Sequence, residues 1–280
     1  MSTDSWRLTR RAALKGLVAT GAGVLVGRVG YGVVYERHQI RMEQVDLQVV
    51  GLPRALDGLR IGLITDLHSS DTVPDADIQA AVALLQRASP DLVALGGDYV
   101  TDANIRRATP VAELLAPLAN APSGAFAVLG NHDDDRVVPA ALAARGFAVL
   151  RDQRTQITLR GEPVDIAGVR YWTRRLNDVA RVLQGSGPTT LLLAHDPRRL
   201  TEAAALDVQL VLAGHTHGGQ VVLPGLGAIA ARRFPVVAGQ ASERNCTLYV
   251  SRGVGTVVAP VRINCPAEVS VLTLRATTHI

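Results

Sequence analysis

Cysteine and aromatic residues are scarce in this chain of 280 residues. It contains two cysteines, Cys246 and Cys265, and only 4% of its residues are aromatic, whereas 48% are hydrophobic. The spacing of the two cysteines excludes a zinc site of the C-x-x-C type. We expect an aliphatic core rich in Ala, Val and Leu. The thiols could pair in an oxidising compartment or stay free and buried, and the sequence leaves both alternatives open.

Linkers, repeats and net charge are also lacking beyond the N-terminal segment. No Pro-, Ser- or Gly-rich linker divides the chain after residue 45, and no repeat of solenoid length occurs. Residues 1–45 hold seven Lys and Arg against three Asp and Glu, which leaves 22 of each sign from the chain's 29 basic and 25 acidic residues. A neutral body argues against nucleic acid as a partner. We expect residues 1–44 to be a separate segment and residues 45–280 to form one domain.

The basic residues of the first segment flank an apolar run. Arg10 and Arg11 precede the run 17–26, and Arg28 follows it. This pattern resembles a twin-arginine export signal, which implies the export machinery and a membrane surface as partners. No A-x-A cleavage site follows, so retention as a membrane anchor in the periplasm or cell envelope is an alternative, although Arg28 makes 16–35 a poor full span. A plain basic amphipathic arm is the third alternative.

Strand-like apolar runs alternate with helical periodicity in the rest of the chain. The buried runs are LRIGLITD, DLVALGGD, GAFAVLGNHD, TTLLLAHDP and VQLVLAGHTHGG. Between them, PDADIQAAVALLQRAS, RATPVAELLAPLAN, VVPAALAARG, TRRLNDVARVLQG and RRLTEAAALD favour helices. The middle and the end of the chain favour antiparallel strands. This order predicts an α/β layered fold with one mixed sheet, or with two sheets face to face and helices outside.

Each of the five buried runs ends in polar residues. Because the carboxyl ends of strands in such folds converge on one edge of a sheet, we expect these side chains to share one cleft. The set comprises Asp66, His68, Asp98, Asn131, His132, His195, His215 and His217. It includes five of the seven histidines of the chain. The other two, His38 and His279, lie near the termini, where we expect them to be solvated.

The composition of this set predicts a metal centre. It contains His, Asp and Asn without Cys, which favours Mn, Fe or Zn over metals that select thiolates. The candidate ligands are too many for one ion, whereas two ions about 3.5–4 Å apart can share a carboxylate and promote displacement at phosphorus. Gly214, Gly218 and Gly219 allow the backbone of GHTHGG to turn and approach closely.

The ordered motifs D-L-H, G-G-D, G-N-H-D, A-H-D-P and G-H-T-H resemble those of the calcineurin-like metallophosphoesterases, from residue 59 to the end of the chain. The runs GHTHGGQVVLP and LYVSRGVGTVVAPVRINCPAE resemble the branch of exported bacterial phosphodiesterases. The resemblance implies a four-layer α-β-β-α sandwich of two mixed sheets flanked by helices. It also implies a catalytic domain over 45–280 and two divalent cations, with manganese first and iron or zinc as alternatives.

The resemblance assigns a role to each position. The positions that match ligands of the first metal are Asp66, His68 and His217. The positions that match ligands of the second metal are Asn131, His195 and His215, and Asp98 matches the carboxylate that bridges both metals. Asn131 also matches an amide that faces the substrate phosphate. His132 matches a histidine that is not a ligand and that protonates the leaving oxygen.

The acid after His132 departs from the usual pattern. Asp133 matches the residue that orients this histidine, but many relatives carry Glu there, and Asp has a shorter reach. Two arginines, Arg136 after GNHDD and Arg262 in PVRINCP, are candidates for contact with a substrate phosphate, with solvated surface arginines as the alternative. We expect the run ARRFPVVAGQ to form a loop near the cleft.

The short spacing between motifs leaves no room for a cap domain and predicts an open cleft. Such a cleft and an export signal favour hydrolysis of a phosphodiester in an envelope substrate that is lipid, cell-wall or nucleotide-linked. A pyrophosphatase for UDP-sugar lipids and a phosphomonoesterase are alternatives on the same fold. An amidohydrolase is disfavoured because it usually opens with H-x-H, a nuclease by the neutral body, and a non-enzymatic tethered module by the complete ligand set.

Overall fold

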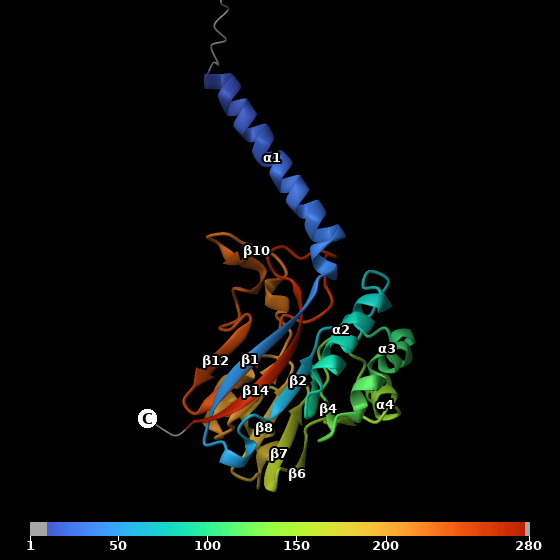
Figure 1. Ribbon diagram of the computed structural model, residues 1–280, viewed down its shortest axis with the longest axis vertical. Coiled ribbons are helices and arrows are strands. Elements are labelled where there is room, and N and C mark those ends of the chain that lie inside the picture. The colour runs from blue at the N-terminus through green and yellow to red at the C-terminus, as the bar shows by residue number, and fades with distance from the viewer. Residues whose placement is uncertain (1–9, 278–280) are drawn as a thin grey trace, which may run out of the picture.

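A long helix and a layered body make up the computed structural model, which describes residues 10–277 (Figure 1). Helix α1 (Arg10–Val34) extends away from the body and is joined to it by the short helix η1 (Glu36–His38). Most side chains of α1 are exposed. The segment Leu14–His38 is long and apolar enough to cross a membrane. The chain therefore has one apolar N-terminal helix, which is compatible with either an export signal or an anchor.

The first sheet has six strands, in the order β1-β14-β2-β3-β4-β5. These strands are β1 (Ile40–Val50), β14 (Ala267–Thr277), β2 (Arg60–Ile64), β3 (Leu92–Leu95), β4 (Ala125–Ala127) and β5 (Ala148–Val149). Pairing is parallel except between β14 and β2. The sheet is therefore mixed, because the last strand of the chain inserts between the first two.

The second sheet also has six strands, in the order β12-β13-β9-β8-β7-β6. They are β12 (Gly239–Glu243), β13 (Cys246–Val250), β9 (Leu210–Ala213), β8 (Thr190–Ala194), β7 (Glu162–Val169) and β6 (Gln153–Leu159). The outer pairs β12–β13 and β7–β6 are antiparallel, and the inner pairs are parallel. The small hairpin of β10 (Val222–Leu223) and β11 (Gly227–Ala228) stands apart from both sheets.

Aliphatic side chains join the layers into a four-layer sandwich. One cluster, which includes Leu63, Leu193 and Leu212, lies between the two sheets. A second cluster packs α2 (Asp75–Ala88), α3 (Ala108–Leu115) and α4 (Val137–Ala143) on the outer face of the first sheet. A third packs α5 (Leu176–Leu183) and α6 (Arg199–Ala205) on the second sheet. The prediction of two mixed sheets flanked by helices is confirmed.

The remaining short elements are four 3-10 turns. They are η2 (Arg54–Leu56), η3 (Ile105–Arg107), η4 (Ala116–Asn120) and η6 (Ile229–Ala231). A fifth, η5 (His217–Gly219), belongs to the GHTHGG turn and is considered with the site.

Several details near the ends of the chain differ from the sequence expectations. Strand β1 begins at Ile40, five residues before the expected boundary at Val45, because it pairs with β14 along its whole length. His38 is not simply solvated, since its Nδ1 lies 2.6 Å from Asp77 Oδ2. His279 lies outside the described residues. Cys246 and Cys265 are both free and buried, so of the two alternatives the structure has unpaired thiols.

Candidate metal centre

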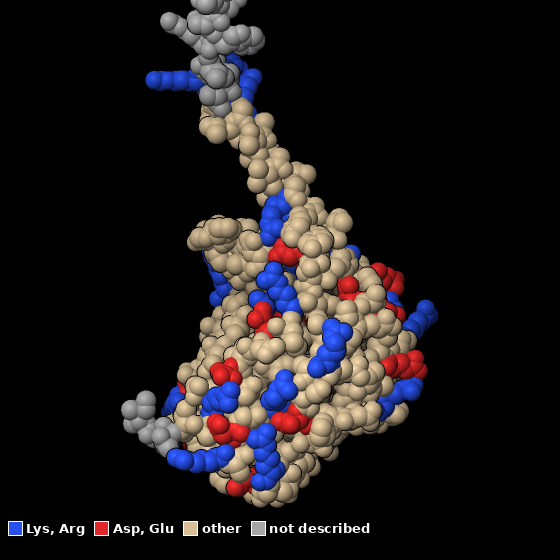
Figure 2. Space-filling view, viewed as in Figure 1, with Lys and Arg blue, Asp and Glu red and all other residues tan. Residues whose placement is uncertain are grey.

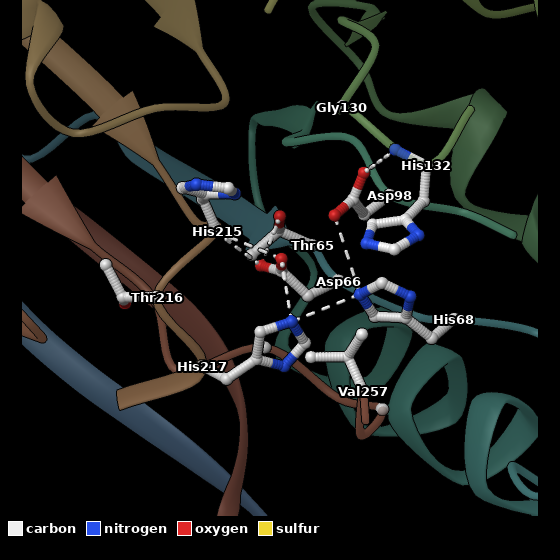
Figure 3. Close-up of polar contacts among 12 residues, drawn as sticks. Thr65, Asp66, His68, Asp98, Gly130, His132, His215, Thr216, His217 and Val257 are labelled. Carbon is white, nitrogen blue, oxygen red and sulfur yellow. Dashed lines mark hydrogen bonds and ion pairs between the residues drawn. The ribbon is translucent and has the colours of Figure 1, made fainter. Parts of the chain in front are cut away.

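The five buried strands end at one edge of the sandwich, where their polar residues meet (Figure 3). Asp66 and His68 follow β2, Asp98 follows β3, and Asn131 and His132 follow β4. From the second sheet, His195 follows β8, and His215 and His217 follow β9. The parallel direction of these strands within each sheet explains the convergence, since their carboxyl ends lie on the same side.

The donor atoms form two groups that meet at the carboxylate of Asp98. Asp66, His68 and His217 make the first group, and Asp98, His195 and His215 make the second, each with ligand atoms within 4.8 Å of one another. The two groups touch, since Asp98 Oδ2 lies 3.1 Å from His195 Nε2 and 3.5 Å from His68 Nε2. A third, overlapping group consists of His68, Asp98 and His132. The first two groups contain six of the seven residues that the sequence suggested as ligands. The seventh, Asn131, directly precedes His132, whose backbone N–H donates to Asp98 Oδ1 at 2.8 Å.

The donor set fits divalent cations. His215 Nε2 and Asn131 Oδ1 are buried polar atoms with no hydrogen-bond partner among the described residues. His68 Nε2 and His217 Nε2 face each other at 3.1 Å, although two neutral imidazoles offer at most one proton there. Buried polar atoms normally have partners, and a cation would satisfy these atoms together. Imidazole, carboxylate and amide donors without thiolate suit Mn, Fe or Zn.

Second contacts orient the ligands toward the centre. His195 Nδ1 lies 2.8 Å from the carbonyl oxygen of Gly96, so this nitrogen carries the proton and Nε2 points at the carboxylates. The hydroxyl of Thr65 donates to Asp66 Oδ2 at 2.8 Å. The backbone N–H of His215 also donates to Asp66, at 3.0 Å. These bonds tie the end of β2 to the end of β9 and fix Asp66 between the two sheets.

Strained backbone concentrates at the same residues. Asp66, His68, Asp98, His215 and His217 all have positive φ, between 49° and 73°. Such conformations are uncommon for residues other than glycine and cost on the order of 1 kcal/mol each. Strain of this kind persists where the surrounding structure imposes it, and it is typical of functional sites.

Two glycines allow loops to pass against the carboxylates. A Cβ on Gly130 would lie 2.0 Å from Asp98 Oδ1, and a Cβ on Gly214 would lie 2.2 Å from Asp66 Oδ2. In GHTHGG, Gly218 and Gly219 have φ of 60° and 81°, which allows the turn η5. The sequence expectation for Gly214, Gly218 and Gly219 therefore holds, and Gly130 adds a close approach that the sequence did not indicate.

Burial and neighbouring charges shift the pKa values of Asp66 and Asp98 in opposite directions. Burial raises the pKa of Asp66 to about 6, and the charge of Asp98 adds to this effect. Burial also disfavours the charged form of Asp98, but His195, His68 and the backbone N–H of His132 outweigh it and hold the pKa of Asp98 well below its usual range. Asp98 is therefore the permanently ionised group at the centre.

The pKa values of the imidazoles also shift in opposite directions. Burial lowers the pKa of His68 to about 4 and that of His215 to about 4, so both are neutral and able to bind a cation. Burial likewise lowers the pKa of His217 well below its usual value. For His195, burial is outweighed by Asp98 and Asp66, which raise its pKa to about 10. Without a cation, His195 carries the positive charge that balances the carboxylates.

Asp133 does not orient His132, which corrects the expectation from the motif. Its carboxylate is buried and accepts hydrogen bonds from the backbone N–H groups of Asp98 (2.8 Å), Tyr99 (2.8 Å) and Gly130 (2.9 Å). His132 Nδ1 instead lies 3.3 Å from Asp102 Oδ1 and accepts the N–H of Asp102 at 3.2 Å. Asp133 therefore positions the backbone of the ligand loops, and Asp102 is the acid that faces His132.

Arg262 is not available to a substrate, which corrects a second expectation. Its side chain is fully buried. The guanidinium donates to the backbone carbonyls of Arg252 (2.8 Å), Gly253 (2.9 Å) and Gly255 (2.7 Å). Its role is to hold together loops behind the metal ligands. Arg136, in contrast, is exposed, and its contact with a substrate phosphate stays a prediction.

Residues that the sequence did not single out flank the second group. The rings of Tyr171 and Phe234 each lie 5.2 Å from the ring of His215. The guanidinium of Arg198 lies 5.2 Å from the ring of Phe234. Phe234 belongs to the run ARRFPVVAGQ, which does form a loop beside the site. For Phe234 the available signal was this run, which we expected near the cleft, whereas no pattern in the sequence indicated Tyr171 or Arg198.

Comparisons with known proteins agree with this geometry. A family model described as "Calcineurin-like phosphoesterase" matches residues 59–219. The chain is 29% identical to the uncharacterized metallophosphoesterase YkuE of Bacillus subtilis, over 97% of this chain and 99% of that protein. It is 32% identical to the phosphodiesterase YaeI of Escherichia coli, over 77% of this chain and 82% of that protein.

One vertebrate relative is a longer protein than this chain. The chain is 31% identical to the transmembrane protein with metallophosphoesterase domain of Danio rerio, over 88% of this chain. It spans 60% of the length of that relative.

Proposed function

This chain belongs to the calcineurin-like phosphoesterase family, and we propose that it hydrolyses a phosphodiester in an envelope-associated substrate with two divalent cations. A metal-dependent phosphoesterase follows from the family and from the buried His and Asp groups. The diester, the envelope location and manganese as the preferred ion are the proposed parts.

The observation that carries the proposal is the pair of donor groups that meet at Asp98. Asp66, His68 and His217 would hold one cation, and Asn131, His195 and His215 would hold the other, with Asp98 between them. When bound, such cations neutralise phosphate charge and activate water for attack on phosphorus. Neutral His68, His215 and His217 are ready to bind a cation without losing a proton.

His132 is the residue suited to proton transfer. It is partly exposed, so a substrate oxygen can reach it, and its ring lies 4.9 Å from that of His68. Asp102 lies beside its Nδ1, with Oδ1 at 3.3 Å and the backbone N–H at 3.2 Å. His132 would then give its Nε2 proton to the leaving oxygen as the P–O ester bond breaks, while the amide of Asn131 faces the phosphate.

Two features support an envelope substrate, and a third supports a diester. Arg10 and Arg11 begin an exposed helix of 25 residues whose length and apolar character suit a membrane. The zebrafish relative is named a transmembrane protein, and the Escherichia coli relative is named a phosphodiesterase. The twin-arginine export machinery and a membrane surface are the proposed partners, and the charge-neutral body disfavours nucleic acid.

The test is a metal-reconstituted activity panel on the purified full-length protein. Metal-free protein is loaded with Mn²⁺, Fe²⁺ or Zn²⁺ and assayed on bis-p-nitrophenyl phosphate, p-nitrophenyl phosphate and a nucleotide-sugar pyrophosphate. We expect the highest kcat/KM on the diester with Mn²⁺, and elemental analysis should give two metal ions per chain. A preference for the monoester or the pyrophosphate would replace the diester assignment, and absence of all three activities would refute the proposed function.

A further inference from the structure

A groove of about 350 Å³ opens directly beside the metal ligands. His215 and His217 line one end, and Phe234, Val221, Val257 and Val261 are among the side chains that continue its wall. In Figure 3, the side chain of Val257 lies next to the imidazoles of His68 and His217. The volume lies in the range of small-molecule sites, roughly 300–1,000 Å³. An apolar wall therefore reaches the position where a phosphate would bind.

The groove lies on the side of the body from which α1 emerges. Gly32 of α1 rests against Val261 and the carbonyl of Arg262, in contacts so close that a Cβ would lie 2.6 Å from that oxygen. Arg28 donates to Asn264 Oδ1 at 2.7 Å and to Glu36 Oε2 at 2.8 Å. Figure 1 shows the lobe with β10 on the same end of the body as the base of the helix. The segment 257–262 therefore forms one wall of the groove and also packs against the base of α1.

Exposed apolar side chains lie on the groove-lining segment at Val258 and on the neighbouring β10–β11 lobe. Val258, which lines the groove, is fully exposed, and Leu226 and Ile229 on the β10–β11 lobe are 57% and 45% exposed. Figure 2 shows this lobe with little Lys, Arg, Asp or Glu on the visible face. At the base of the helix, Tyr31 and Tyr35 are also exposed. Tyrosines at such a place are typical of a membrane–water interface.

The backbone presents Val258 to solvent at a cost. Val258 has φ of 66°, and the N–H of Ala259 donates to the carbonyl of Val257 at 2.7 Å across it. A β-branched residue rarely adopts this conformation. The exposure of the valine side chain is unfavourable in water but not in contact with a lipid surface.

The attachment of α1 brings the body close to a bilayer. The candidate membrane span Leu14–His38 ends at η1, the short helix that joins α1 to the body. Arg28 then turns to the body, where it pairs with Glu36. A helix that crossed a bilayer at this span would hold this end of the body near the membrane surface. Val258, Leu226 and Ile229 would then touch the interface.

We propose that this groove holds an apolar chain of a membrane-lipid phosphodiester, with the phosphate at the metal centre and the chain leading out toward the bilayer. The inference rests on the proposed phosphodiesterase function and names its substrate class. Arg233 also lines the groove, with its guanidinium 5.0 Å from the ring of Phe234. A cation with an apolar stem at this level suits an anionic headgroup.

The test uses the full-length protein, loaded with Mn²⁺ in maltoside micelles at a fixed substrate mole fraction. The substrates are p-nitrophenyl phosphodiesters with methyl, butyl, octyl and dodecyl chains. We expect kcat/KM to rise roughly tenfold or more from butyl to octyl, since each buried methylene contributes to binding. In Val258→Asp this gain should shrink severalfold, whereas Val258→Leu should keep it. Asp tolerates positive φ better than Val, so the variant is expected to fold.

A matched control separates groove binding from partition into micelles. Leu176→Asp places the same charge at another exposed apolar residue, at the start of α5, and should keep the full gain. If short diesters are hydrolysed and chain length brings no gain, or if Val258→Asp and Leu176→Asp behave alike, the lipid assignment is wrong and the phosphodiesterase function stands. If no diester is hydrolysed, both are wrong.

Discussion

The thiol of Cys265 donates a hydrogen bond to the carbonyl oxygen of His217 at 3.3 Å. The backbone N–H of the same cysteine donates to Glu36 Oε1 at 3.1 Å. Glu36 in turn accepts from Arg28 of α1. One residue therefore connects a candidate metal ligand to the base of the membrane-suited helix. The base of α1 therefore packs on the loop behind the site, and the contacts of Glu36 and Cys265 support the position of His217.

Removal of Glu36 should loosen this connection. Glu36→Ala leaves the buried N–H of Cys265 without an acceptor and Arg28 without its ion partner. We expect the free energy of unfolding to fall by about 1–3 kcal/mol, the cost of a buried unsatisfied group. Thermal unfolding in detergent measures the loss. Glu113→Ala, which removes an exposed pair with Arg145, is the control and should change stability little. Equal effects of the two variants would show that the contact with Cys265 contributes nothing.

The roles of His132 and Asp102 can be separated by leaving group. His132→Ala should keep its metal and lose about 10²–10⁴ in turnover on an alkyl phosphodiester, whose leaving oxygen needs a proton. On bis-p-nitrophenyl phosphate the loss should be much smaller, because p-nitrophenolate leaves without protonation. Asp102→Asn removes the carboxylate beside His132 and should give a smaller loss on the alkyl diester. Unchanged turnover of His132→Ala on the alkyl diester would remove this residue from the mechanism.

Asp133 should behave as a residue that supports the fold of the site. Asp133→Ala removes the acceptor of three short hydrogen bonds, from the backbone N–H groups of Asp98, Tyr99 and Gly130, and of a longer one from Val100. At about 1–3 kcal/mol for each, the loss of stability should be at least about 3 kcal/mol, with weaker metal retention. Asp135→Ala, which removes the partly exposed ion pairs with Arg151 and Arg170 but no backbone N–H acceptor, is the matched control. Denaturant unfolding and elemental analysis measure both. A stable, fully metallated Asp133→Ala would contradict this role.

The sequence predicted the place of the site better than its supporting contacts. The positions at the strand ends follow from the alternation of apolar runs and polar termini, since parallel strands must end together. The partner of His132 could not be predicted, because it depends on the conformation of the loops. Asp133 accepts hydrogen bonds from backbone N–H groups, and Asp102 is the acid that faces the ring of His132. The burial of Arg262 could not be predicted either. Its acceptors are backbone carbonyl groups, and every residue has one, so no sequence pattern marks them. Sheet order was open because β14 inserts beside strands about 200 residues away.

Metal binding should release a proton from the second group. Without a cation, Asp98 and Asp66 outweigh the effect of burial and hold the pKa of His195 at about 10, so this imidazole is charged at neutral pH. A cation that binds Nε2 must displace that proton, whereas His68 and His215, with pKa values of about 4, lose none. Apparent affinity should therefore rise with pH, by about tenfold per unit above the pKa of Asp66 near 6. Titration calorimetry in buffers of different ionisation enthalpy should give about one proton released, and zero would contradict the assignment.

Gly130 should be essential for the shared carboxylate. A methyl group there would lie 2.0 Å from Asp98 Oδ1 and 2.6 Å from the backbone N of Asp98, and backbone cannot move aside cheaply. Gly130→Ala should therefore displace Asp98 and lower metal content and turnover together. Gly187→Ala is the control, since its Cβ would come no closer than 3.3 Å, to Asp165. Because Asp98 lies against both His68 and His195, its displacement should weaken both donor groups, so elemental analysis should give fewer than one metal ion per chain. Retention of two ions by Gly130→Ala would mean that Asp98 does not bridge them.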